Sequence, residues 1–379
     1  MTRKRAGLTI AISGVGALQP GGPVARAIRA VPGFRGRLLG LSYDPLDPLN
    51  YEPGLIDDVI LMPYPQQGAA HVGERLLHAH ARYPIDVLLP TLDSELPVLI
   101  SLAPRLAEAG IRVVLPTAEM LALRSKARLS ELAQRTGLHM PHTRAAYSIE
   151  AARKIAGEFS YPFMVKGQLY GAARVDNETQ LASVAAQFIA SWGVPVMLQQ
   201  MVWGTEFDVV VLGGRRGELL GAVAMKKLQL DGNGKAWGGV TVTDPMLDQT
   251  VGQAMAGLRW PGIFELELMR DDRSGVFYLI EVNPRVPAWV GLAVAAGQNL
   301  PWALVELALG RQVAPMRDYT VGTMTLRQCF DVIAPMHMFE KLAIDGELSH
   351  ASASRPLRLP RVPSAGTAAA PAKRRRSRT

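Results

Sequence analysis

The chain has 379 residues, which is long enough for two or three domains with hydrophobic cores and therefore for an enzyme. Apolar residues make up 48% of it and charged residues 20%, and no run of eighteen apolar residues is present to span a bilayer. The basic start and short apolar stretch of residues 1–17 are more typical of a first β-strand than of a secretion signal. We therefore expect a cytoplasmic globular protein without a membrane span.

The net charge of +8 lies in the C-terminal tail, because residues 355–379 hold eight Lys or Arg and no Asp or Glu. This tail is rich in Pro, Ala and Gly and is predicted to be disordered and solvated. Weak contact with RNA or an anionic surface is the alternative, and nucleic acid is otherwise not expected as a partner. The single cysteine, Cys329, can form no internal disulfide and is expected to be a small buried hydrophobe.

Residues 1–115 alternate between β-branched runs and helix-like segments. The strand-like runs are "LTIAISGVGA", "GRLLGLSYD", "DVLLPTLDSE" and "RVVLPT", and the helix-like segments are "GPVARAIRA", "AAHVGERLLHAHARY" and "ELPVLISLAPRLAEAG". This alternation predicts a parallel, right-handed βαβ layer. The first turn carries Gly14 and Gly16 but Gln19 in place of a third glycine, so it is a weak dinucleotide signal or simply a tight turn.

Two segments between residues 116 and 204 could meet a nucleotide. A helix is predicted after Ser125, ending at Gly137. Lys166 then ends a short apolar strand beside a small-residue loop, where it could reach phosphate oxygens, although a solvated lysine is the simpler alternative. Gln199 and Gln200 end the next strand, and their amide groups could pair with a purine edge.

A strand beginning at Glu206 and a hairpin follow. The hairpin carries Lys226 and Lys227, and its glycine-rich connection over residues 231–239 would suit a mobile lid.

The stretch 262–285, "GIFELELMRDDRSGVFYLIEVNPR", concentrates oxygen ligands on a predicted hairpin. Alternation places Glu265 and Glu267 on the face opposite Phe264, and Glu281 and Asn283 on one common face. Carboxylates packed this closely would raise one another's pKa unless a cation lay between them.

We therefore expect Glu267, Glu281 and Asn283 to hold a metal ion. Ligands that are all oxygen favour Mg²⁺ or Mn²⁺ over zinc, and such ions bridge nucleotide phosphates. Arg285 would neutralise a transferring phosphoryl group. The alternative is an exposed acidic face that keeps the protein soluble.

Over residues 8–310 the order and spacing of these motifs resemble the ATP-grasp superfamily, nearest to the branch with carbamoyl-phosphate synthase and carboxylate–amine ligases. The strand "LIEVNPR" is similar to the metal-binding strand E-x-N-P-R, and Glu267 lies fourteen residues before Glu281, where the family has another ligand. The resemblance implies an α/β protein: an N-terminal Rossmann-like parallel layer, then a two-lobed ATP-grasp domain with antiparallel sheets. It also implies ATP and Mg²⁺ or Mn²⁺ as cofactors.

Carried over residue by residue, the resemblance assigns the remaining positions. The implied phosphate-binding lysines are Lys126 and Lys166, and the implied adenine hinge is formed by Gln199, Gln200 and Val202. Glu206 is the implied ribose-binding acid. The implied cation at the γ-phosphate is Lys226 or Lys227, with Lys226 preferred. Two departures from the family's pattern make nucleotide and metal binding the firmer expectation, ahead of turnover. Gln199 stands where many members have Glu, and the loop after Lys166 has few glycines.

The resemblance implies a division of the chain and a reaction. The expected units are an N-terminal domain (1–115), the small lobe (116–196) and the metal-binding lobe (197–310), followed by an extension of unassigned role (311–354) and the basic tail (355–379). The expected reaction is ATP-dependent joining of a small-molecule carboxylate to an amine, or to a thiol, through an acyl phosphate.

Asp93 and Glu95 could meet the amine, and a homodimer is compatible with the chain. An inactive Mg-ATP-binding sensor and a Rossmann-type oxidoreductase remain the alternatives.

Overall fold

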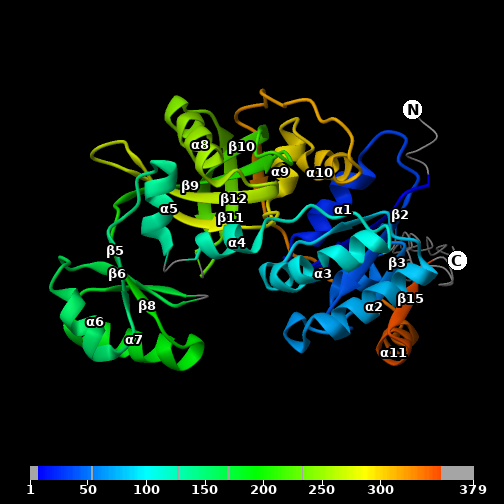
Figure 1. Ribbon diagram of the computed structural model, residues 1–379, viewed down its shortest axis with the longest axis horizontal. Coiled ribbons are helices and arrows are strands. Elements are labelled where there is room, and N and C mark those ends of the chain that lie inside the picture. Colours follow the sequence, from blue (N-terminus) through cyan, green and yellow to red (C-terminus); the bar gives the residue numbers. More distant parts are fainter. Residues whose placement is uncertain (1–6, 53, 126–127, 169–170, 233, 351–379) are drawn as a thin grey trace, which may run out of the picture.

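The computed structural model describes residues 7–350 apart from 53, 126–127, 169–170 and 233. Lys126 and the basic tail therefore lie outside the described residues. The chain forms one mostly parallel sheet and two antiparallel sheets, each covered by helices. The predicted α/β class, with a parallel layer followed by antiparallel sheets, is confirmed (Figure 1). No helix among the described residues has the length and apolar character needed to cross a bilayer.

The first sheet contains four parallel strands and one antiparallel edge strand, in the order β15-β3-β2-β1-β4. Its strands are β1 Thr9–Ser13, β2 Arg37–Ser42, β3 Asp58–Leu61, β4 Val87–Leu89 and β15 Glu347–Ser349. Its helices are α1 Gly21–Arg29, α2 Ala69–Arg82 and α3 Leu96–Glu108, with short 3₁₀ turns at Pro48–Tyr51, Pro65–Gln67 and Asp93–Glu95. Every residue of β1 is buried, because helices cover both faces of a parallel sheet.

Two details of this sheet differ from the sequence prediction. The stretch "RVVLPT" forms only an isolated bridge between Arg112 and Val87 rather than a strand. The prediction also omitted β3, because its run "DVIL" is only four residues long. The three helices and strands β1, β2 and β4 appear where they were expected, whereas β15 was not expected in this sheet.

The second sheet forms a small lobe over residues 143–200, which lies apart from the rest in Figure 1. Its strands, in the order β5-β8-β6-β7, are β5 Thr143–Ala146, β8 Val196–Gln200, β6 Phe163–Lys166 and β7 Ala172–Val175. Helices α6 Ile149–Ala156 and α7 Glu178–Trp192 cover one face. The side chains of Ser148 and Asn177 cap these helices by accepting backbone N–H groups. The lobe therefore has its own core, built around Phe163 and Leu198.

The third sheet is antiparallel and carries the carboxylate hairpin. Its order is β13-β12-β9-β10-β11-β14, with β9 Gly204–Gly213, β10 Leu219–Leu230, β11 Ala236–Val242, β12 Gly262–Asp271, β13 Phe277–Asn283 and β14 Met324–Leu326. Helices α8 Pro245–Leu258 and α5 Leu129–Thr136 pack together beside one face, preceded by α4 Ala118–Leu123. Helices α9 Val290–Ala295 and α10 Leu300–Ala308 lie on the other face, against α1. Helix α5 stops at Gly137, as predicted, and Gly137 adopts a left-handed conformation.

The C-terminal extension ties the third sheet to the first. After β14 pairs with β11, the chain forms α11 Met336–Asp345 and returns as β15 beside β3 (Figure 1). Glu347 of β15 receives ion pairs from Arg82 at 2.7 Å and Arg75 at 3.4 Å. Cys329 lies in this extension and is exposed, so the expectation of a buried cysteine is wrong; the segment around it packs too loosely to cover it.

Replacing Glu347 with alanine is expected to lower the free energy of unfolding by about 1–3 kcal/mol, because the partly buried Arg75 and the exposed Arg82 would lose the buried carboxylate that they share. The measurement is urea denaturation at neutral pH. Lys341→Met is the matched control, since the Lys341–Asp345 pair on α11 is about half exposed on both sides and should contribute under about 0.5 kcal/mol. Equal effects of the two substitutions would contradict a structural role for β15.

Candidate functional site

The carboxylate hairpin pairs β12 with β13 and brings the expected oxygen ligands together. Glu267 lies opposite Glu281 in the register, and Glu265 lies opposite Asn283. The amide Nδ2 of Asn283 donates to Glu265 Oε2 at 2.9 Å and to Glu267 Oε1 at 2.7 Å. Phe264 and its alternate neighbours pack into the core beneath α8, so the predicted assignment of faces is confirmed.

Glu265 is buried at the centre of this cluster, although the sequence analysis did not assign it as a ligand. Its Oε1 accepts a hydrogen bond from the indole Nε1 of Trp289 at 2.5 Å. Burial, followed by the charge of Glu267, raises the pKa of Glu265 above the usual carboxyl range. The signal was present in the sequence, since Glu265 shares the face of Glu267, but nothing there placed Trp289 beside it.

Lys227 neutralises much of the negative charge in the cluster. Its ammonium group lies 3.1 Å from Glu206, 3.1 Å from Asp208 and 3.9 Å from Glu267, and only 5% of its side chain is exposed. Burial alone would lower the pKa of Lys227, but the surrounding carboxylates outweigh burial and raise it. Lys227 is therefore held charged.

Lys226, the preferred candidate from the sequence, lies on the other face of the sheet. It stands opposite Phe207 in the β9–β10 register, and Phe207 packs into the core beneath α8. Successive side chains of a strand point to opposite faces, so only one of two adjacent lysines can reach the carboxylates. The structure selects Lys227 for that position, which corrects the choice of Lys226.

Asp208 is a second buried acid that the sequence analysis missed. It is 3% exposed, and burial, followed by the charge of Glu265, raises its pKa well above the usual range despite the opposing effect of Lys227. The detectable signal was a lone acid in the apolar run "FDVVVLG". A carboxylate in such a run needs a buried partner to offset the loss of its hydration.

Arg285 links the third sheet to the N-terminal layer. Its Nε lies 3.1 Å from Asp93 Oδ1, and its Nη1 lies 3.9 Å from Glu265. Burial opposes its charge, but Glu265 and Asp93 lead a group of carboxylates that raise the pKa of Arg285. Arg285 thus lies beside the cluster, as expected, and is oriented by Asp93 of the N-terminal layer.

The expectation that Asp93 and Glu95 meet an amine is not supported. Asp93 is engaged by Arg285 and, at 3.8 Å, by Arg124. Glu95 is buried and accepts hydrogen bonds from the hydroxyls of Ser13 at 2.6 Å and Tyr43 at 2.5 Å. Because a buried, fully hydrogen-bonded carboxylate cannot reach a ligand, Glu95 stabilises the loop at the carboxyl end of the parallel strands.

The expected nucleotide contacts lie in and beside the small lobe. Lys166 is buried at the end of β6, as predicted. Gln199 is also buried, and its Nε2 donates to Thr143 Oγ1 at 3.0 Å, whereas Gln200 is exposed. Val202 lies in the short connection between β8 and β9, which joins the lobe to the third sheet. Glu206 follows on β9, which begins at Gly204, and reaches the carboxylate cluster through Lys227.

The donor set suits a magnesium ion that is shared with a nucleotide. Among residues 7–350 without the gaps named above, no three His, Cys, Asp or Glu side chains form a group that could hold a metal. Glu267, Glu281 and Asn283 instead offer two carboxylates and an amide oxygen. Mg²⁺ commonly uses one or two carboxylates and completes its octahedron with phosphates and water. Burial is the largest cause of the raised pKa values of Glu265 and Asp208, and neighbouring carboxylates raise them further, a repulsion that a cation would offset.

Glu265 makes stability depend on pH. Because its pKa is raised on folding, the folded state retains a proton that the unfolded chain releases, so stability falls as pH rises from about 4 toward the folded pKa and levels off above it. Urea denaturation across pH 4–9 should show this fall in the wild type. The Glu265→Gln variant, which cannot ionise there, should show a smaller fall, and identical slopes would contradict the assignment.

Comparison of the chain with known proteins identifies a matching family model and several relatives. A family model described as ATP-grasp in the biosynthetic pathway with Ter operon matches residues 193–328. The carbamoyl phosphate synthase large chain of Thermotoga neapolitana is 24% identical over 368 residues, which cover 86% of this chain and 31% of the relative. The chain spans about a fifth to a third of the length of the curated relatives it matches.

Two solved structures share the fold. An L-amino acid ligase from Bacillus licheniformis superposes with a TM-score of 0.61 at 17% identity, over 80% of this chain and 74% of that one. The biotin carboxylase domain of the Hydrogenobacter thermophilus 2-oxoglutarate carboxylase gives 0.65 at 17% identity, over 83% and 73%. Together with the E-x-N-P-R strand, these matches show that residues 193–328 carry an ATP-grasp segment and that the chain is similar to the carbamoyl phosphate synthase large chain.

Proposed function

We propose that the protein is an ATP- and Mg²⁺-dependent ligase that joins a carboxylate to an amine, or to a thiol, through an acyl phosphate. The observation that carries the proposal is that Glu267 lies opposite Glu281 in the β12–β13 register and accepts a hydrogen bond from Asn283, beside a buried lysine and Arg285. Such a cluster has little structural use, because burying acids costs stability. It does suit a site that receives a polyphosphate with its cation. We also propose a cytoplasmic location, where ATP and Mg²⁺ are available.

The proposed nucleotide site lies between the small lobe and the third sheet. Lys166, together with Lys126, would bind the α- and β-phosphates. The connection from Gln199 through Gln200 to Val202 would border the adenine, and Glu206 would contact the ribose. The solved biotin carboxylase domain is described as a dimer in complex with MgADP, ADP and bicarbonate, which is the type of ligand set expected here.

In the proposed reaction, an oxygen of the substrate carboxylate attacks the γ-phosphorus of ATP and the bond to the β-phosphate oxygen breaks. This gives an acyl phosphate and ADP. The amine then attacks the acyl carbon, phosphate leaves, and the amine loses a proton to complete the amide. The protein contributes position and charge rather than a covalent intermediate of its own.

The side chains of this chain would divide that work. Arg285, oriented by Asp93, would place its positive charge beside the transferring phosphoryl group, and Lys227 would add a second charge. A bound Mg²⁺, held by Glu267, Glu281 and Asn283, would supply electrostatic neutralisation of the phosphates.

The direct test is ADP release by the purified protein from Mg·ATP, first alone and then with pools of amino acids and small carboxylic acids. Release that requires both a carboxylate and an amine would support the ligase. Release that requires neither would point to an ATPase and contradict it.

A Mg-ATP-binding module without turnover is the second candidate. The observation in its favour is Gln199, whose amide nitrogen is committed to Thr143 at 3.0 Å and which replaces a common Glu of the family. Tight ATP binding with no ADP from any pool would favour this module. The Gln199→Glu substitution distinguishes the ligase from the binding module, because a gain in turnover would show that the catalytic machinery is otherwise intact.

A further inference from the structure

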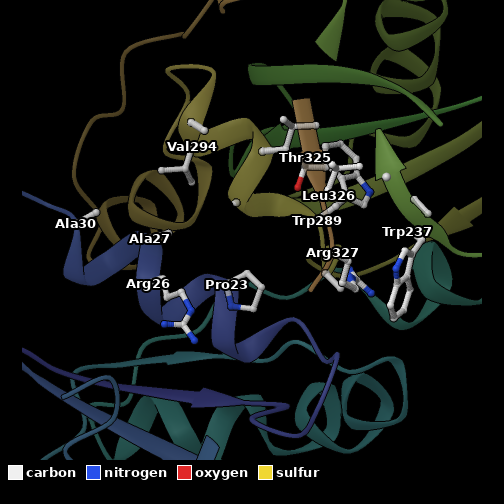
Figure 2. Close-up of a pocket in the computed structure, with 16 residues that line it drawn as sticks. Pro23, Arg26, Ala27, Ala30, Trp237, Trp289, Val294, Thr325, Leu326 and Arg327 are labelled. Atoms are coloured by element: carbon white, nitrogen blue, oxygen red, sulfur yellow. The ribbon is translucent and has the colours of Figure 1, made fainter. Parts of the chain in front are cut away.

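A cavity with a volume of about 580 Å³ lies between the N-terminal layer and the far edge of the third sheet, and no expected site residue lines it. Its walls come from α1, α9, the start of β11 and β14, as Figure 2 shows. Small-molecule sites typically have volumes of about 300–1,000 Å³ and mostly apolar walls. The cavity therefore has the size of a site for a compact organic molecule.

The walls are largely apolar. Ala27 of α1 and Ala30, which follows that helix, line the cavity together with Leu292 and Ala295 of α9, and the indoles of Trp237 and Trp289 add flat surfaces. Trp289 also donates to Glu265, so one side chain belongs both to this cavity and to the carboxylate cluster.

Two arginines supply the charge in the cavity. Arg26 is already paired with Glu52 at 2.9 Å. Arg327 lies over the ring of Trp237 at 5.8 Å, and no carboxylate among the described residues lies within 4.0 Å of its guanidinium. Burial lowers the pKa of Arg327, and Asp231 offsets this only in part. Arg327 is thus a half-buried cation that an anion in the cavity would stabilise.

We propose that this cavity binds a small organic anion with an apolar body, specifically an aryl or branched-alkyl carboxylate. The carboxylate would pair with Arg327, whose planar fork matches two carboxylate oxygens. The apolar body would lie against Trp289, Leu292 and Ala295. Binding of this anion does not depend on the ligase reaction, so the two proposals can fail separately.

The test is isothermal titration calorimetry on the full-length protein without nucleotide. The probes are phenylacetate and 4-methylpentanoate. Phenylacetamide is the control without a negative charge, and acetate is the control without the large apolar group. We expect each apolar carboxylate to bind about tenfold or more tightly than either control, since the controls lack the charge-assisted bond or the buried apolar area.

Two variants locate the binding. Arg327→Gln should weaken phenylacetate about tenfold or more, whereas Arg317→Gln, which removes an exposed arginine of the same extension, should leave it unchanged. Ala295→Trp should abolish binding, because Ala295 is exposed and a larger side chain there would fill the cavity without entering the core. Circular dichroism and MgADP binding should match the wild type in all three variants.

Equal affinity for phenylacetate and phenylacetamide would overturn the role of Arg327. Unchanged binding in Ala295→Trp would place the ligand elsewhere and overturn the site, as would no binding of any probe at millimolar concentration. Failure of the wild-type protein to bind MgADP would instead count against the proposed function and would leave the proposed anion site intact.

Discussion

Replacing Glu281 with alanine is expected to reduce metal-dependent ATP turnover by about a thousandfold or more while the protein remains folded. Glu281 faces Glu267 across the β12–β13 register, so its loss would leave the proposed cation with one carboxylate and the amide of Asn283. Its side chain is only partly buried, so the substitution opens no large cavity in the core. The measurement is ADP release under the conditions that support turnover in the wild type.

Three further variants serve as comparisons for the Glu281 experiment. Glu281→Gln keeps the shape but removes the charge, and it should lose most of the same activity. Glu340→Gln removes an exposed acid on α11 and should behave as the wild type. Because residues that act together are not additive, Glu267→Ala combined with Glu281→Ala should be little worse than either alone. Wild-type turnover in Glu281→Ala with a normal circular dichroism spectrum would rule out the metal site proposed here.

Replacing Lys227 with methionine is expected to destabilise the protein by about 3–5 kcal/mol, the largest stability effect that the site predicts. The substitution leaves Asp208 buried without its counter-charge, and Glu206 and Glu267 lose the same partner. Urea denaturation at neutral pH measures the change. Mg²⁺ with ADP should recover part of it, because bound cations can replace some of the missing charge.

Lys226→Met is the matched control for Lys227, since it alters the neighbouring residue on the other face of β10. It should change stability by less than about 1 kcal/mol. The double variant Asp208→Leu with Lys227→Met should be more stable than Lys227→Met alone, because it removes the unpaired acid as well. If the two single lysine substitutions had equal effects, the assignment of Lys227 to the cluster would be wrong.

Local features of the sequence predicted much of the fold. Period-two alternation placed Glu265 and Glu267 opposite Phe264, since successive side chains of a strand must point to opposite faces. The left-handed turn at Gly137 was predictable for a similar reason, because glycine adopts that conformation at little cost. The short run of β3 was not predictable, because a run of four residues with three apolar ones does not distinguish a strand from a loop.

Alternation could not decide between Lys226 and Lys227, because it says only that the two residues face opposite sides. Which side holds the carboxylates depends on the pairing of β10 with β9, and that pairing joins residues from different segments of the chain. Asp208 was missed for a related reason: its importance comes from Glu265 and Lys227, which reach it only across strands.

Most elements, the faces of the carboxylate hairpin and the family resemblance could be predicted from the sequence, because these depend on the spacing of neighbouring residues. Three contacts could not be predicted in this way: Asp93 orients Arg285, Trp289 caps Glu265, and β15 completes the edge of the first sheet. These contacts join residues far apart in the chain, and packing of whole elements, rather than local spacing, brings them together. The cavity between α1, α9 and β14 arises in the same way and has no signature in any single segment.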